Sequence, residues 1–143
     1  MVSQITPEIK TPDPGRPAIR VLIVEDQPLV RKGLRMRMDL ESDFSVVGEA
    51  ETGQIAVRMV DAQKPDVVVM DIEMPVMDGL RATEIIRARH PQIIIIILSI
   101  HCETVYKEKA FRAGANAFVE KVGGAVALIN EIRSAVLIKG VQG

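Results

Sequence analysis

The 143-residue sequence has a single cysteine, Cys102, which excludes an internal disulfide and a zinc site built from cysteines. Its net charge is −1, so it has no excess of basic residues of the kind that binds nucleic acid or an anionic membrane. The longest apolar run, residues 93–98, is too short to span a bilayer, and the N-terminus lacks the apolar segment of a signal peptide. These absences predict a soluble, cytoplasmic protein.

Most of the chain has the composition of one globular domain. Hydrophobic residues make up 48% of the sequence and charged residues 26%, which is ordinary for a folded domain of this length. The first 18 residues are rich in proline and poor in apolar side chains. We therefore expect a flexible leader at residues 1–18, a folded domain at 19–140, and a short stub or linker start at 141–143.

Apolar runs alternate with segments of helical periodicity along the folded part. The runs predict buried strands at residues 19–24, 67–70 and 93–98. Residues 44–50 alternate well enough for a further strand, and residues 117–120 are expected to form a short last one. Helices are expected at residues 28–40, 54–63, 80–89, 103–113 and 125–139. This alternation predicts an α/β fold with a parallel sheet covered on both faces.

The first and last predicted helices each carry an apolar stripe. In the first we expect burial of Leu29, Val30, Leu34 and Met38. In the last we expect burial of Val126, Ile129, Ile132 and Val136. Leu137, Ile138 and Val141 extend the apolar character beyond what one helix face needs. This end is therefore a frayed, partly exposed terminus, a stub that packed on a missing linker, or, with the first helix, a contact between two copies of the chain.

Polar side chains follow four of the predicted strands. They are Glu25 and Asp26 after the first strand, Asp71 after the third, Ser99 after the fourth and Lys121 after the fifth. Parallel strands end at one edge of a sheet, so these side chains can converge. Three carboxylates close together repel unless a cation lies among them, and oxygen ligands alone favour Mg²⁺. A hydroxyl and an ammonium beside Mg²⁺ make a phosphoryl site, where a carboxylate can act as the nucleophile.

Four motifs carry these residues: Val-Glu-Asp at 24–26, Met-Asp-Ile-Glu-Met-Pro-Val-Met-Asp-Gly at 70–79, Leu-Ser-Ile-His at 98–101, and Gly-Ala-Asn-Ala-Phe-Val-Glu-Lys at 114–121. Together they resemble the receiver domain of bacterial two-component response regulators, over residues 19–139. The resemblance implies a flavodoxin-like, doubly wound (βα)5 fold with a five-stranded parallel sheet of strand order 2-1-3-4-5.

The resemblance also implies a magnesium site. Asp71 matches the phospho-accepting aspartate and a metal ligand, and Asp26 matches the carboxylate that binds Mg²⁺ directly. Glu25 matches the carboxylate that usually acts through water. The backbone carbonyl of Glu73 would complete the protein's share of the metal ligands.

Further positions match the residues that respond to the phosphoryl group. Ser99 matches the switch hydroxyl, Lys121 the lysine that pairs with the phosphoryl group, and Phe118 the aromatic switch residue. Glu73 and His101 occupy positions that tune dephosphorylation in the family.

Each residue also has a local explanation. Glu25 and Asp26 can cap the following helix, Asp71 can cap a turn, Ser99 can bind a loop amide, and Phe118 can belong to the core. Their coincidence in one order along the chain favours a shared site.

Two positions depart from the most frequent receiver pattern. Val122 follows the lysine where most receivers have proline, and Ile100 stands where many have alanine. Ile100 is expected to crowd the path between Ser99 and Phe118. With the ending at residues 131–140, these features favour the NarL/FixJ (LuxR) type of transcriptional regulator.

The expected function is a phosphorylation-dependent switch rather than a conventional enzyme. A histidine kinase or phosphotransfer protein would phosphorylate Asp71, and an output domain absent from this chain would control transcription. The chain contains no helix-turn-helix, so no nucleic-acid contact is expected within it, nor a membrane partner. The alternatives are a phospho-independent binding module and a magnesium-dependent aspartyl-phosphate phosphatase. The phosphatase would need a second aspartate where this chain has Glu73.

Overall fold

The structure is a computed structural model that describes residues 17–74 and 77–142. Residues 1–16 of the expected leader and residue 143 of the expected stub lie outside the described residues. Within the described ranges, no helix is both long enough and apolar enough to cross a membrane.

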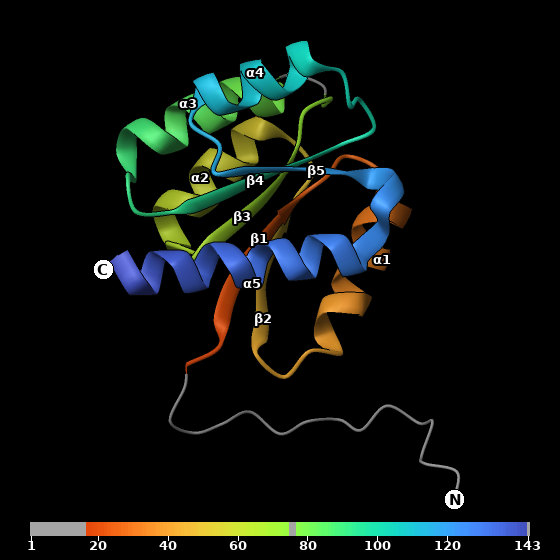
Figure 1. Cartoon of the computed structure of the whole chain (residues 1–143), viewed down its shortest axis with the longest axis vertical. Helices are drawn as coiled ribbons and strands as arrows, with labels where there is room; N and C mark the ends of the chain where they lie inside the picture. The colour runs from red at the N-terminus through yellow and green to blue at the C-terminus, as the bar shows by residue number, and fades with distance from the viewer. Residues whose placement is uncertain (1–16, 75–76, 143) are drawn as a thin grey trace, which may run out of the picture.

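Five strands and five α-helices alternate along the chain (Figure 1). The strands are β1 (Ile19–Val24), β2 (Phe44–Ala50), β3 (Val67–Asp71), β4 (Ile94–Ser99) and β5 (Ala117–Glu120). The helices are α1 (Pro28–Asp39), α2 (Gly53–Gln63), α3 (Gly79–Arg89), α4 (Thr104–Ala113) and α5 (Gly124–Gln142), with a short 3₁₀ helix, η1 (Lys121–Gly123), before α5. The strands form one parallel sheet in the order β2-β1-β3-β4-β5, which confirms the predicted fold.

Helices cover both faces of the sheet (Figure 1). The side chains of one face pack against α1 and α5, and those of the other face pack against α2, α3 and α4. Every residue of β3 and β4 is buried. This two-sided burial explains why these strands read as continuous apolar runs instead of alternating patterns.

Local sequence features fix the loops that carry the site. The hydroxyl of Thr52 accepts a hydrogen bond from the Ile55 N–H at 3.1 Å and caps α2. After β3, the Gly79 N–H donates to the Ile72 carbonyl at 2.8 Å. A Cβ on Gly79 would lie 1.9 Å from the Asp71 carbonyl oxygen, so this close approach requires glycine.

The predicted stripes of α1 and α5 were wrong at one residue each. Leu29 is 84% exposed, because it lies nine residues, or about two and a half turns, from the buried Met38 and so faces the other way. Val126 is 58% exposed, and Leu128 is buried instead beside Ile129. The α5 helix continues to Gln142, beyond the expected domain end at residue 140.

Candidate functional site

Three carboxylates meet at the carboxyl edge of the sheet. Glu25, Asp26 and Asp71 each offer an oxygen atom within 4.8 Å of the others. The neighbouring strands β1 and β3 end together and so place them there. Glu25 and Asp71 are buried, with 1% and 6% of their surface exposed, whereas Asp26 is half-buried.

Lys121 brings a positive charge from the end of β5. Its Nζ donates to Glu25 Oε1 at 2.7 Å and lies 3.6 Å from Asp71 Oδ2. One ammonium group therefore faces two buried carboxylates, and it compensates their charge only in part. Lys121 does not point into solvent as an isolated lysine usually does, since only 20% of its side chain is exposed.

The electrostatic conflict is strongest at Asp71. Burial, followed by repulsion from Glu25, raises the pKa of Asp71 to about 7. Burial opposes the charge of Lys121, but its hydrogen bond with Glu25 and its attraction to Asp71 leave the lysine pKa raised. Lys121 is therefore protonated at neutral pH, whereas Asp71 is protonated in part of the molecules there.

The donor set fits a hard divalent cation. Three carboxylate groups lie within reach of one point, and a cation there would relieve the repulsion that raises the Asp71 pKa. Glu73 lies in the same region, and its N–H donates to Asp71 Oδ1 at 3.3 Å. No histidine or cysteine belongs to this cluster of the described residues, so the ligands suit Mg²⁺ better than zinc or copper.

A cavity of about 320 Å³ joins these groups. Its walls include Asp26, Asp71, Glu73, Ser99 and Lys121. An anion entering it would meet the ammonium group of Lys121 and the hydroxyl group of Ser99, beside carboxylates whose charge a bound cation would offset. The cavity can therefore hold a phosphoryl-sized group beside a carboxylate nucleophile.

Ser99 ends β4 and is buried. Its Oγ accepts a hydrogen bond from the His101 N–H at 3.0 Å, which is the local role that the sequence left open. Ser99 also lines the cavity together with Asp71. Its hydroxyl group could therefore donate a hydrogen bond to a phosphoryl oxygen if Asp71 were phosphorylated.

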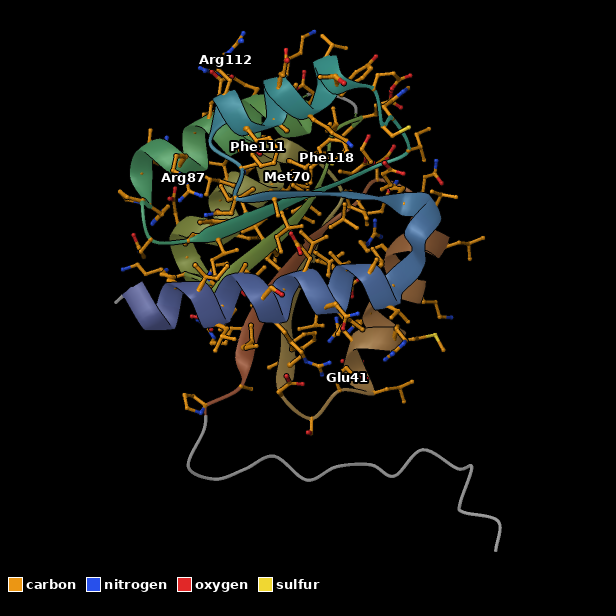
Figure 2. The ribbon with its side chains drawn as sticks, viewed as in Figure 1. Glu41, Met70, Arg87, Phe111, Arg112 and Phe118 are labelled. Atoms are coloured by element: carbon orange, nitrogen blue, oxygen red, sulfur yellow. The ribbon has the colours of Figure 1, made fainter. Side chains whose placement is uncertain are left out.

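Phe118 lies on the face of the sheet covered by α2, α3 and α4 (Figure 2). It is half-buried against that core, with Lys107 Nζ 5.9 Å from its ring centre. Ile100 lines the same cavity as Ser99, so its expected crowding of the path from Ser99 to Phe118 stays a prediction. Its side chain is 67% exposed.

The sequence did not reveal a set of contacts around His101. Its Nε2 is in close contact with Glu73 Oε1, and its ring stacks on Tyr106 with a centroid distance of 4.6 Å and an interplanar angle of 18°. Glu73 and His101 were both of interest as single positions, but nothing in the sequence pairs them. Tyr106 lies in the first turn of α4 and carried no motif signal.

Comparisons with known proteins agree with this geometry. The chain matches the response regulator receiver domain family over residues 21–133. It is 35% identical over 115 residues to the transcriptional regulatory protein DegU of Brevibacillus brevis, covering 80% of this chain and 49% of DegU. It is 38% identical over 116 residues to the response regulator UvrY of Escherichia coli O157:H7, covering 81% of this chain and 53% of UvrY. The chain thus spans about half the length of these relatives.

Solved structures show the same relationship. A LuxR-family two-component response regulator from Aurantimonas sp. SI85-9A1 superposes with a TM-score of 0.81 at 32% identity, covering 84% of this chain and 86% of that one. The response regulator domain of Thermotoga maritima CheB superposes with a TM-score of 0.78 at 34% identity, covering 82% of this chain and 96% of that one. The chain therefore belongs to the response regulator receiver domain family, with relatives of the LuxR/NarL type.

Proposed function

We propose that this receiver domain is a switch that accepts a phosphoryl group on Asp71 from a histidine kinase or a phosphotransfer protein. The observation that carries the proposal is the position of Lys121, which contacts Glu25 at 2.7 Å and lies 3.6 Å from Asp71 inside a carboxylate cluster. A half-buried lysine that only balanced charge would need one carboxylate. Here it stands beside the nucleophile and lines the cavity with Ser99.

In the proposed transfer, an ionised oxygen of Asp71 attacks the phosphorus of a phosphohistidine. An O–P bond forms, the N–P bond breaks, and its electron pair leaves with the imidazole of the donor. Lys121 pairs with a phosphoryl oxygen as charge moves onto Asp71, and the Ser99 hydroxyl donates to another. Both side chains already line the cavity next to Asp71.

We assign the metal role to the carboxylate cluster. Asp26 and Asp71 would hold Mg²⁺ directly, Glu25 through water, and Glu73 through its backbone carbonyl. When bound, the ion supplies positive charge against the phosphoryl oxygens. The ligand set, three carboxylates with oxygens within 4.8 Å, supports this assignment.

The domain would catalyse only its own phosphorylation and dephosphorylation. The phosphatase alternative needs a free acid two residues after the nucleophile. This chain has a glutamate, Glu73, at that position instead of an aspartate, and His101 contacts its carboxylate. This contact favours the switch over the phosphatase.

The relatives suggest the output and the setting. DegU is a transcriptional regulatory protein, so we propose that this receiver controls transcription through a segment outside the chain, with no nucleic-acid contact of its own and no membrane partner. The free, exposed Cys102 suits the reducing cytoplasm, which we propose as its compartment. We also propose a homodimer through the end of α5, where Leu137 is 69% exposed and Ile138 56% exposed.

Phosphorylation with acetyl phosphate tests the proposal. The protein with Mg²⁺ should gain one hydroxylamine-labile phosphoryl group, and Asp71→Asn should gain none. Asp66→Asn is the matched control, because Asp66 stands just before β3 and its carboxylate accepts from the Arg20 N–H, far along the strand from the cluster. Equal labelling of Asp71→Asn and the unaltered chain would overturn the assignment.

A further inference from the structure

His101 contacts three parts of the fold at once. Its backbone N–H donates to Ser99 Oγ at 3.0 Å, so it holds the hydroxyl at the end of β4. Its ring contacts Glu73 in the β3–α3 connection and stacks on Tyr106 in α4. A single residue therefore joins the wall of the phosphoryl cavity to a helix on the surface.

The α4 helix has few buried anchors of its own. Ala110 is its only buried residue, and Val105 and Phe111 are about half exposed. Near its first turns it is held to the sheet by Lys107, which contacts Phe118 and lies 3.7 Å from Glu120, and by the Tyr106 stack. A helix held by so few buried groups can shift at low free-energy cost.

We propose that His101 acts as a latch that couples the phosphorylation state of Asp71 to the position of α4 through Tyr106. This inference rests on the proposed function. The contact of His101 with Tyr106 is distinct from the contact of Phe118 with Lys107, which is the other link between the sheet edge and the first turns of α4.

Two effects of a phosphoryl group would open the latch. The Ser99 hydroxyl would turn toward the phosphoryl oxygens, which weakens its bond with the His101 N–H. The added negative charge would also repel the Glu73 carboxylate, which lines the same cavity, and so would loosen its contact with the His101 ring. Among the polar contacts of His101 with described residues, only the one between its Nδ1 and Glu103 Oε2, at 3.8 Å, is then unweakened. The His101 ring leaves Tyr106, and the first turn of α4 is released.

The chain carries a built-in probe for this event. Tyr106 is the only tyrosine, and there is no tryptophan, so intrinsic fluorescence reports on this one side chain. A stacked imidazole quenches tyrosine emission by contact. Emission should therefore rise when acetyl phosphate and Mg²⁺ phosphorylate Asp71, with the phosphoryl group counted by intact mass in the same sample.

Two histidine variants separate the latch from general effects. His101→Leu should start with the higher emission and show no further rise on phosphorylation. His90→Leu is the matched control: the other histidine of the chain bonds to Asp61 at 2.7 Å on the α2–α3 surface, and this variant should behave as the unaltered protein does.

The outcomes separate the two proposals. A phosphorylated protein with unchanged Tyr106 emission would overturn the latch and leave the proposed function intact. A full rise retained in His101→Leu would do the same. Failure to gain a phosphoryl group at Asp71 would overturn the proposed function, and the latch with it.

Discussion

At the scale of single residues, the carboxyl group of Asp71 is held where its charge is costly. Burial and the nearby Glu25 raise its pKa to about 7, although Lys121 Nζ lies only 3.6 Å away. A nucleophile must be ionised, so the metal-free site is poorly set for reaction and a cation would improve it. The crowding of buried carboxylates thus both destabilises the metal-free fold and creates the proposed metal site.

This conflict predicts how stability depends on pH without metal. The pKa of Asp71 is about 7 in the folded protein, against an ordinary value of 3.8. The folded state binds this proton more tightly, so the contribution to stability is complete below about pH 4 and is lost as pH rises through about 7. We expect the free energy of unfolding to lose on the order of 3 kcal/mol over that range from this group.

Urea unfolding in EDTA from pH 5 to pH 8 measures this loss. Asp71→Asn should remove most of the decline, whereas Asp66→Asn should retain it. The two histidines are present in all three proteins, so only the difference between variants counts. Parallel pH profiles for Asp71→Asn and the unaltered chain would contradict the assigned cause.

At the scale of elements, the turn between β3 and α3 depends on the close approach of Gly79. Gly79→Ala should destabilise the protein by about 1–3 kcal/mol, because its Cβ would lie 1.9 Å from the Asp71 carbonyl oxygen. Gly33→Ala in α1 is the matched control: no atom lies within 4 Å of its Cβ, and it should stabilise by about 0.5–1 kcal/mol. Chemical denaturation of both variants checks the prediction. Equal effects of the two would refute it.

The sequence predicted the strands better than the helix faces. The bounds of β1, β2 and β5 agree with the expectation to the residue, and those of the fully buried β3 and β4 agree to within one residue, since turn residues delimit each strand in the sequence. The stripes failed at Leu29 and Val126, which are apolar but lie off the buried faces of α1 and α5. The spacing of apolar residues at a helix end is compatible with more than one choice of buried face, and only the packing of the folded protein decides which face is buried.

The sequence predicted those parts of the site that lie directly at the ends of strands. The convergence of Glu25, Asp71 and Lys121 follows from a parallel sheet whose strands end together. Side-chain pairs between loops were not predictable, because their geometry depends on the folded backbone. The stack of His101 on Tyr106 is of this kind.

At the scale of the whole molecule, metal binding should stabilise the fold. The unfolded chain has no carboxylate cluster, so Mg²⁺ at a hundred times its dissociation constant should add about 2.7 kcal/mol. Asp26→Asn should bind Mg²⁺ more weakly and should be more stable than the unaltered chain without metal, because one of three clustered charges is gone. Melting temperatures with and without millimolar Mg²⁺ decide this, with Asp66→Asn as control. Indifference of the unaltered chain to Mg²⁺ would rule out the site.

The assembly of the domain is a second question at this scale. The exposed Leu137 and Ile138 at the end of α5 predict association that increases with protein concentration and with beryllofluoride as a phosphoryl mimic. Leu137→Glu should abolish it, whereas Val105→Glu on α4 should not. Sedimentation at several concentrations measures this. A monomer in both states would remove the dimer and leave the end of α5 as a face that packs on a linker.

The central claim is that Asp71 is the phosphoryl acceptor. After phosphorylation with acetyl phosphate and Mg²⁺, borohydride reduction converts an aspartyl phosphate to homoserine, and peptide mass mapping then locates the modified residue. We expect homoserine at residue 71 alone, with Asp66 and Asp78 on either side of β3 unmodified as internal controls. Homoserine at any other aspartate, with residue 71 intact, would contradict the account.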